Sequence, residues 1–382
     1  MKLRLYNTLS NTIEEFTPIN LNKVKMYICG PTVYDRPHIG NARPAVIFDV
    51  LYRLLKHIYN DVVYVRNITD IDDKIYKASK IKNISIDELT NKTIQMYHED
   101  TKALNVLPVD IEPRATQHIS DIIEFIKHII DLGHAYYSQG YVYFDVNSIS
   151  NYGILSNQHE LKNGSRVEIS NNKKNPADFI LWKPTNDSFP IGWNSPCGKG
   201  RPGWHIECSA MSHKYLGNRF DIHGGGCDLI FPHHENEIAQ SYAVNSEIIA
   251  NYWIHNGHVM INGTKMSKSL GNFYTVHDLI NEFDGEVIRL ALLMTHYRSP
   301  LNFSKDLLNQ SKSILDRWYN SIMNINIVNT AELSVNIINS LLDDLNTPKA
   351  ISYISSMVNN INKGSIEQAN TLINTCRVLL GI

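Results

Sequence analysis

The sequence predicts an α/β fold in which a Rossmann-like parallel-sheet domain is split by an insertion and followed by a connecting fold and an all-α helical bundle. Three observations support this prediction. The apolar run Val24–Cys29 precedes helically spaced apolar residues and the β-rich run Val62–Val65, as in a β-α-β unit. A second buried strand is predicted at Phe220–Ile222, where the sheet resumes. Beyond Ser304, apolar residues recur at the spacing of packed helices.

The elements follow in a clear order along the chain. The helix after the first strand holds Pro44, which we place in its first turn, where a missing N–H is tolerated. The inserted part opens with an amphipathic helix over Ile119–Ile130 and continues with a strand at Tyr141–Phe144. We therefore predict five parts: the first half of the Rossmann-like domain (1–115), the insertion (116–200), the second half of that domain (201–252), the connecting fold (253–305) and the bundle (306–382).

Length and composition exclude several classes of protein. The 382 residues are too many for one small domain. With 36 Lys+Arg against 38 Asp+Glu, the formal net charge of −2 provides no global basic field, so any polyanion must be bound by local patches. Hydrophobic residues at 43% and charged residues at 19% are typical of a globular protein and exclude a disordered one.

The N-terminus and the cysteines indicate a reducing compartment. No apolar stretch resembles a signal peptide or reaches the roughly 18 residues of a membrane-spanning helix, so we expect a cytoplasmic protein without a membrane partner. Five cysteines, an odd number scattered between Cys29 and Cys376, are not typical of a disulfide framework. Cysteines without disulfide partners in a reducing compartment favour metal binding.

A loop after the first strand has the features of a phosphate site. It delivers His38, Gly40 and Asn41 to the start of the first long helix, where unpaired N–H groups and the helix dipole attract anions. The imidazole and amide groups can donate hydrogen bonds to developing negative charge, and Gly40 leaves room for a nucleotide. Alternatively, His38 and Asn41 only cap the helix.

A second loop, Asn262–Asn272, places Lys265 and Lys268 three residues apart among hydroxyl groups and glycines. Ammonium groups on a loop that can close suit a polyphosphate, because they can follow charge onto a leaving pyrophosphate. The alternative is an ordinary solvated basic loop.

Together, the His-Ile-Gly-Asn and Lys-Met-Ser-Lys-Ser segments resemble the two signature motifs of class I aminoacyl-tRNA synthetases. The family's first motif usually ends in His, where this chain has Asn41. Within the class, four further segments resemble cysteinyl-tRNA synthetases: YICGPTVYD (27–35), NITDIDDK (67–74), GWHIECSAM (203–211) and FPHHENE (231–237). The family continues beyond its helical bundle into a small anticodon-binding domain, which we expect this chain to lack.

The resemblance implies one zinc ion per chain, held by Cys29, Cys208, His233 and Glu237. The residues support part of this set independently, because His233 and Glu237 lie four apart in a helix opened by Pro232 and share a face. Sequence spacing alone cannot join the two cysteines, which would otherwise be interpreted as buried structural residues. His234 would point elsewhere, into the pocket or behind the ligands.

Zinc would solve a problem of selectivity, because cysteine and serine differ by sulfur against oxygen in nearly the same volume. A borderline-soft ion binds a thiolate directly, so the correct substrate supplies an additional ligand. Discrimination of this kind needs no hydrolytic editing.

The resemblance also assigns the remaining pocket residues. The Gly-rich segment before Asp228 is predicted to be an adenosine-binding turn, although a plain strand-to-helix turn is the alternative. Trp204 and Val259 could equally be core residues. Asp70, Asp72 and Asp73 invite a magnesium site, but we favour a solvated or ion-paired loop. The expected ATP-binding residues are His38, Asn41, Gly225, Gly226, Asp228, Val259 and Lys268, and those for cysteine and its adenylate are Thr32, Asn67, Thr69 and Trp204.

The implied function is ATP-dependent activation of L-cysteine and its transfer to the 3′-terminal adenosine of tRNA(Cys), with Mg²⁺ accompanying ATP. His38, Asn41, Lys265 and Lys268 would be the catalytic residues, acting by positioning and electrostatics. A monomer is expected from the family. Two alternatives stay open: a cysteine ligase of the mycothiol pathway with an amino-sugar acceptor, and a catalytically silent zinc-containing RNA-binding paralogue.

Overall fold

The computed structural model describes residues 2–157, 172–261, 263–265, 273–326 and 332–382. Its centre is a four-stranded, fully parallel sheet in the order β10-β9-β3-β4. The two middle strands are β3 (Lys23–Ile28) and β9 (Phe220–Gly226), and the edges are β4 (Asp61–Arg66) and β10 (Ala250–Asn256). Strands from either side of the insertion therefore share one sheet, and the predicted fold class is confirmed.

Helix α1 (Ile39–Ile58) connects β3 to β4 and packs across the sheet. Most of its apolar residues, among them Val46, Leu51 and Leu55, are fully buried, as the helical spacing predicts, whereas Ile58 at its last position is exposed. One detail of the prediction is wrong. The helix begins at Ile39, so Pro44 is its sixth residue and lies beyond the first turn, where the Gly40 carbonyl loses its usual donor.

The inserted part forms an antiparallel sheet in the order β5-β6-β7-β8, covered by helix α4 (Ile119–Asp131). Its core joins Ile122, Phe144 and Leu181, which come from that helix and from β6 and β7. The strands are β5 (Ala135–Ser138), β6 (Tyr141–Phe144), β7 (Phe179–Pro184) and β8 (Gly200–Pro202). The chain returns to the central sheet through α5 (Trp204–Leu216) and leaves β9 for α6 (Glu235–Asn245).

Smaller elements surround the central sheet. A hairpin of β1 (Arg4–Asn7) and β2 (Thr12–Glu15) opens the chain, and a three-stranded sheet in the order β12-β11-β13 follows β10. That sheet consists of β11 (Val259–Ile261), β12 (Thr264–Lys265) and β13 (Leu301–Phe303). The helices here are α2 (Asp73–Lys82), α3 (Ile86–Ala103), α7 (Val276–Ile280) and α8 (Gly285–Leu293). Short helical turns occur at Ala115–His118, Val146–Ser148, Cys227–Leu229 and Ile230–His234.

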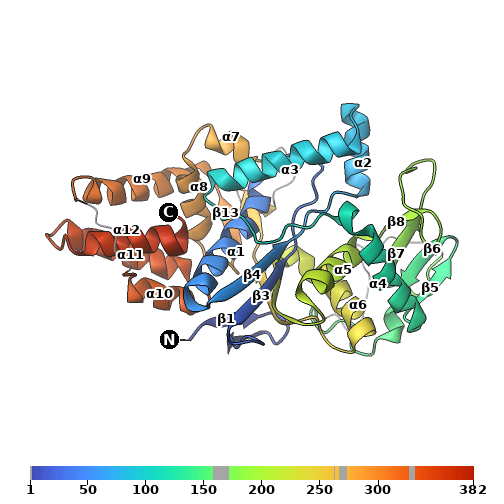
Figure 1. Ribbon diagram of the computed structural model, residues 1–382. Helices are drawn as coiled ribbons and strands as arrows, with labels where there is room; N and C mark the ends of the chain where they lie inside the picture. Colours follow the sequence, from blue (N-terminus) through green and yellow to red (C-terminus); the bar gives the residue numbers. More distant parts are fainter. Residues whose placement is uncertain (1, 158–171, 262, 266–272, 327–331) are drawn as a thin grey trace.

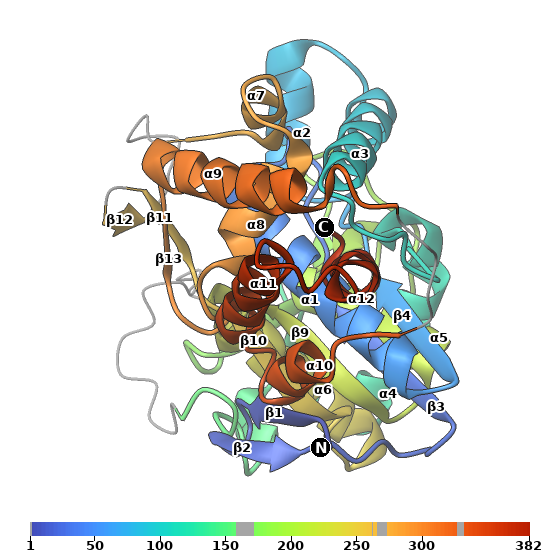
Figure 2. The ribbon, with the colours of Figure 1, turned by 90° about the vertical axis from the view of Figure 1, so that its left-hand side faces the viewer.

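The C-terminal part is a bundle of helices. It consists of α9 (Lys305–Ile322), α10 (Val335–Leu342), α11 (Thr347–Ile361) and α12 (Gln368–Thr375), and a turn at Cys376–Leu380 follows. The bundle lies at one end of the molecule and the inserted sheet at the other (Figure 1), and Figure 2 shows the molecule from the side of the bundle. One apolar core runs from α1 through α8 into the bundle, so the bundle supports the helix that follows β3.

The five predicted parts stay predictions in their boundaries. Strand β10 runs across the boundary drawn after residue 252. Strand β8 runs across the boundary drawn after residue 200, so that its last residues still pair within the sheet of the insertion. Among the helices that the structure describes, none is long and apolar enough to span a membrane.

Candidate functional site

A cavity of about 350 Å³ opens beside the carboxyl ends of β3 and β9 and the start of α1. Ligands bind to open parallel sheets at this edge. Its lining brings together predicted residues from remote segments: Cys29, Thr32, His38, Asn41, Trp204, Gly226, Asp228 and Val259.

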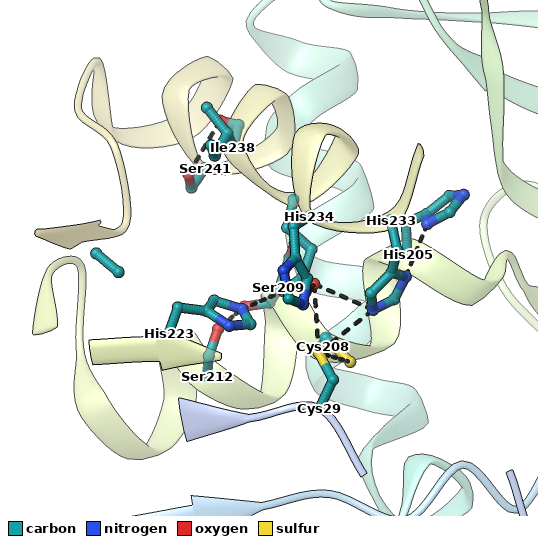
Figure 3. Close-up of polar contacts among 12 residues, drawn as sticks. Cys29, His205, Cys208, Ser209, Ser212, His223, His233, His234, Ile238 and Ser241 are labelled. Atoms are coloured by element: carbon teal, nitrogen blue, oxygen red, sulfur yellow. Dashed lines mark hydrogen bonds and ion pairs between the residues drawn. The ribbon is translucent and has the colours of Figure 1, made fainter. Parts of the chain in front are cut away.

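Four side chains that could ligate a metal converge beside this cavity, which one of them, Cys29, also lines. Cys29 comes directly after β3 and Cys208 lies in α5, and their sulfurs are 3.7 Å apart. The Cys29 sulfur also lies 3.4 Å from His233 Nε2 and 3.6 Å from Glu237 Oε1. Figure 3 shows Cys29, Cys208 and His233 pointing toward one another.

These separations suit a single ion. Bonds of about 2.0–2.3 Å to one tetrahedral zinc separate its ligand atoms by roughly 3.3–3.8 Å. The donor atoms of Cys29, Cys208, His233 and Glu237 all lie within 4.8 Å of one another. Two sulfurs, one imidazole and one carboxylate are a donor set that zinc accepts, so the residues present fit this metal.

Ionisation within the cluster also favours a cation. A hydrogen bond from the Cys29 thiol lowers the pKa of Cys208 to about 6, while burial raises the pKa of Cys29 well above its usual range. Burial opposes the charge on Glu237, yet the imidazoles of His223 and His233 lower its pKa to about 2. A thiolate and a carboxylate therefore meet in a site from which water is largely excluded.

Three further histidines surround the cluster, and of these only His234 has a place predicted from the sequence. His223 Nε2 lies 2.9 Å from Glu237 Oε2, and His205 Nδ1 lies 2.9 Å from His233 Nδ1. His234 Nδ1 lies 2.7 Å from His255 Nε2, but its Nε2 lies 4.0 Å from Glu237 Oε1, so the prediction that His234 points away from the ligands is wrong. With Cys29 and Glu237, His223 and His234 form a second group with metal-ligand spacing. Histidines beside predicted ligands in the 203–211 and 231–237 segments were the available signal.

His38 and Asn41 form a reciprocal cap at the start of α1. His38 Nδ1 accepts from the Asn41 N–H at 3.2 Å, and Asn41 Oδ1 accepts from the His38 N–H at 3.2 Å. The capping alternative is thus present in the structure. Both residues also line the cavity and are only half-buried, so capping and anion binding are compatible.

The Gly-rich segment is not a turn, contrary to the prediction. Gly224 to Gly226 complete strand β9 and pair in parallel with β10. A Cβ at Gly224 would lie 2.6 Å from the ring of Phe48, so the absence of a side chain lets α1 approach the sheet. Gly226 and the exposed Asp228 line the cavity, whereas Gly225 faces Leu229 and His234.

The predicted adenylate residues divide into two groups. Thr32 and Trp204 line the cavity, and the Trp204 ring stacks on His233 with centroids 4.2 Å apart. Asn67 and Thr69 are fully buried behind it. Asn67 Oδ1 accepts from the Gly30 N–H at 3.0 Å, so Asn67 supports the wall of the cavity rather than facing it.

Buried Glu207 precedes the candidate ligand Cys208 and receives a hydrogen bond from the Thr69 hydroxyl at 3.1 Å. Burial raises the pKa of this carboxyl well above its usual range.

The acidic segment at the end of β4 has structural partners. Asp70 accepts from the N–H and hydroxyl of Thr116, and Asp72 caps α2. Asp73 forms ion pairs with Arg201 and Lys183. Ion pairing is thus observed for Asp73, at the start of α2, whereas Asp70 and Asp72 accept hydrogen bonds from uncharged groups.

The second lysine motif is described only at its start. The backbone of Lys265 belongs to β12, next to the cavity-lining strand β11. The Lys265 side chain and the whole of Lys268 lie outside the described residues.

Family profiles match almost the whole chain. Residues 15–313 match the profile of "tRNA synthetases class I (C) catalytic domain", and residues 336–381 match the profile of the "DALR domain".

Curated relatives are similar over nearly the full sequence. The cysteine–tRNA ligase of Paramagnetospirillum magneticum is 52% identical over 371 residues, covering 96% of this chain and 81% of the relative. The cysteine–tRNA ligase of Rickettsia felis is 50% identical over 394 residues, covering 100% and 86%.

Solved structures share the fold at low identity. A Mycobacterium tuberculosis methionyl-tRNA synthetase in complex with methionyl-adenylate has a TM-score of 0.68 at 15% identity, covering 94% of this chain and 89% of its own. A leucyl enzyme from Agrobacterium radiobacter K84, in a ternary complex with tRNA, has a TM-score of 0.65 at 11% identity, covering 96% and 83%.

Proposed function

Because the chain belongs to the cysteine–tRNA ligase family of class I aminoacyl-tRNA synthetases, we propose that it activates L-cysteine with ATP and transfers it to tRNA(Cys) at the metal-centred cavity described above. The observation that carries the assignment to this cavity is the meeting of Cys29, Cys208, His233 and Glu237 beside the start of α1. A thiol-binding group and a phosphate-binding helix terminus thus share one pocket.

We assign one zinc ion per chain to these four residues. Zinc held there would supply a thiophilic Lewis acid that lowers the pKa of a substrate thiol and prefers sulfur to a hydroxyl oxygen. The chain's own contribution is to orient the donors. His223 donates to Glu237, and the Trp204 ring covers His233, which keeps both ligands in place and limits the access of water.

The first half-reaction needs no enzyme nucleophile. The cysteine carboxylate attacks the α-phosphate of ATP, the bond to the bridging oxygen breaks, and pyrophosphate leaves with its Mg²⁺, forming the mixed anhydride. His38 and the N–H groups at the start of α1 stabilise the charge that develops on the α-phosphate. Lys265 and Lys268 are proposed to neutralise the pyrophosphate.

Nucleotide binding is assigned to the same cavity. Asp228 would accept hydrogen bonds from the ribose hydroxyls, and Val259 would lie beside the adenine, with Gly226 leaving space between them. In the second half-reaction, a ribose hydroxyl of the terminal adenosine attacks the cysteinyl carbonyl and AMP leaves with the anhydride oxygen. We further propose that the enzyme acts in the cytoplasm as a monomer.

Cysteine-dependent exchange of pyrophosphate into ATP, followed by charging of tRNA(Cys), tests this function. We expect exchange that requires cysteine and is lost after removal of zinc with a chelator. Absence of exchange under every metal condition would contradict the catalytic assignment. Exchange without tRNA charging, together with transfer of cysteine to an amino sugar, would replace the proposed acceptor.

A further inference from the structure

Arg43 is a buried cation that belongs to the phosphate-side helix. It lies in α1 two residues after Asn41, and its side chain is wholly buried. Its guanidinium donates to four backbone carbonyls. Nη1 reaches the Gly257 and His258 oxygens at 2.8 and 2.9 Å, and Nη2 reaches the His296 and Ser299 oxygens at 3.3 and 2.7 Å.

These four carbonyls belong to two neighbouring segments, of which the first lines the cavity assigned to the nucleotide. The first, residues 256–259, connects β10 to β11 and lines the cavity at each of its four positions; we call it the base-side loop. The second, residues 296–299, is the turn that leads into β13. Val259 pairs in parallel with Leu301, so the two segments enter one small sheet side by side.

The contact between the two segments is tight. The Gly257 N–H donates to the Tyr297 oxygen at 2.8 Å, and a Cβ at Gly257 would lie only 2.5 Å from the Ser299 oxygen. From the side of α1, the Arg43 guanidinium donates hydrogen bonds to both segments. One side chain thus ties the base-side loop, the neighbouring turn and the phosphate-side helix together.

Burial of the Arg43 guanidinium charge costs free energy. Among the described residues no carboxylate lies within ion-pairing distance of Arg43, and burial lowers its pKa to about 10, which leaves it protonated at neutral pH. An unpaired buried charge is expensive unless hydrogen bonds satisfy it. Arg289, which is equally buried, differs in having the Asp49 carboxylate as its partner.

We propose that Arg43 is a positioning residue for ATP, which holds the base-side loop at the separation from His38 and Asn41 that the nucleotide spans. The proposal rests on the assignment of ATP to this cavity. The distance from adenine to α-phosphate is limited by the nucleotide itself, so a loop that drifts from α1 cannot serve both ends of the ligand at once. Arg43 is wholly buried and its guanidinium donates to the backbone of the base-side loop and the neighbouring turn, so we expect its effect on ATP to be indirect.

The fold should tolerate loss of this side chain, because the turn is also held from its far side. Asp344 accepts from the Tyr297 hydroxyl at 2.7 Å and from Arg298 Nε at 2.8 Å. Replacement of Arg43 should therefore release the base-side loop from α1 while the turn stays attached to the helical bundle.

The test compares Arg43→Lys and Arg43→Met with Arg289→Lys, a matched control at another fully buried arginine that donates to backbone carbonyls. Calorimetry measures the Kd for ATP, pyrophosphate exchange gives KM and kcat, and thermal unfolding gives Tm. For Arg43→Met we expect the Kd for ATP to rise by roughly tenfold or more with the KM for cysteine unchanged, and Arg43→Lys should recover part of the loss. Arg289→Lys should lower Tm yet keep the Kd within about twofold, as expected of an independent site.

A second variant leaves Arg43 intact. Gly257→Ala introduces a methyl group against the Ser299 oxygen, displaces the base-side loop and should raise the Kd for ATP in the same way. An unchanged Kd in Arg43→Met, or a rise that Arg289→Lys matches at equal loss of Tm, would overturn the proposal. If the wild-type protein binds ATP but does not activate cysteine, the proposed function is refuted. The role of Arg43 is then still decided by the comparison of Kd values among the variants.

Discussion

His233 Nε2 lies 3.1 Å from Glu237 Oε1, and both side chains are fully buried. The two residues are one helical turn apart, on the segment that begins at Pro232 and continues into α6. Burial disfavours the charged imidazole, yet the Glu237 carboxylate raises the pKa of His233 to about 10. The two side chains are therefore already arranged as metal ligands. A metal ion can take the place of the positive charge that His233 carries.

The hydrogen bond from His223 to Glu237 should support metal binding without direct ligation. His223→Asn removes the 2.9 Å contact with Glu237 Oε2, and loss of such a support typically costs about 10–100-fold in metal affinity. Competition with a chromogenic chelator measures that affinity. His134→Asn, at a histidine hydrogen-bonded to Ser148 far from the site, should leave it unchanged.

The dual role of His38 can be separated by two substitutions. His38→Asn keeps an N-cap acceptor, whereas His38→Ala loses it and should reduce stability by about 1 kcal/mol. Both variants should lower kcat for pyrophosphate exchange by roughly 10²–10³-fold if the imidazole stabilises charge on the α-phosphate. Wild-type kcat in His38→Asn would reduce His38 to a capping residue.

Asp49 should be a stability determinant remote from the chemistry. It lies between Arg53 and Arg289, and it also accepts from the Leu107 N–H at 2.8 Å. Asp49→Asn leaves two buried guanidinium groups short of a counter-charge and should cost about 3–5 kcal/mol in the free energy of unfolding. Urea denaturation measures this loss. At the exposed pair of Lys214 with Asp121, Asp121→Asn should cost no more than about 1 kcal/mol.

Glu112 should make stability depend on pH. Burial alone would raise its pKa, but the hydrogen bond from His98 and the charge of Arg66 lower it. A carboxyl with a lowered pKa contributes stability above its unfolded pKa of about 4.3, and that contribution disappears as pH falls through the lower folded value.

The wild-type protein should thus exceed Glu112→Gln in free energy of unfolding by about 1–3 kcal/mol at pH 7. The difference should shrink as the pH falls below about 4, and a constant difference from pH 7 to pH 3 would contradict the assignment.

Much of the fold follows from local patterns. The apolar runs of β3 and β4 and the helical spacing of α1 predict a parallel β-α-β unit, and the resumption of the sheet at Phe220 is correctly placed. The details that fail depend on tertiary contacts. Gly224 belongs to a strand because it pairs with Ile28 and Ile254 on either side, and the Phe48 ring of α1 lies where its Cβ would be; no local signal in the glycines reveals these neighbours.

The site was predictable only in part for a related reason. His233 and Glu237 share a face at a spacing that sequence can show, whereas Cys29 and Cys208 meet through the packing of α5 beside β3. Resemblance to a family, not spacing, joined them. Arg43 gave no signal, because its partners are backbone carbonyls more than two hundred residues away.

The most direct test of the account is the metal content and amino-acid selectivity of Cys208→Ser. Elemental analysis of the wild-type protein should give one zinc per chain, and Cys376→Ser, at a buried cysteine of the helical bundle, should keep it. Cys208→Ser should lose the zinc and show a smaller preference for cysteine over serine in pyrophosphate exchange. Stoichiometric zinc together with undiminished selectivity in Cys208→Ser would contradict the proposed site.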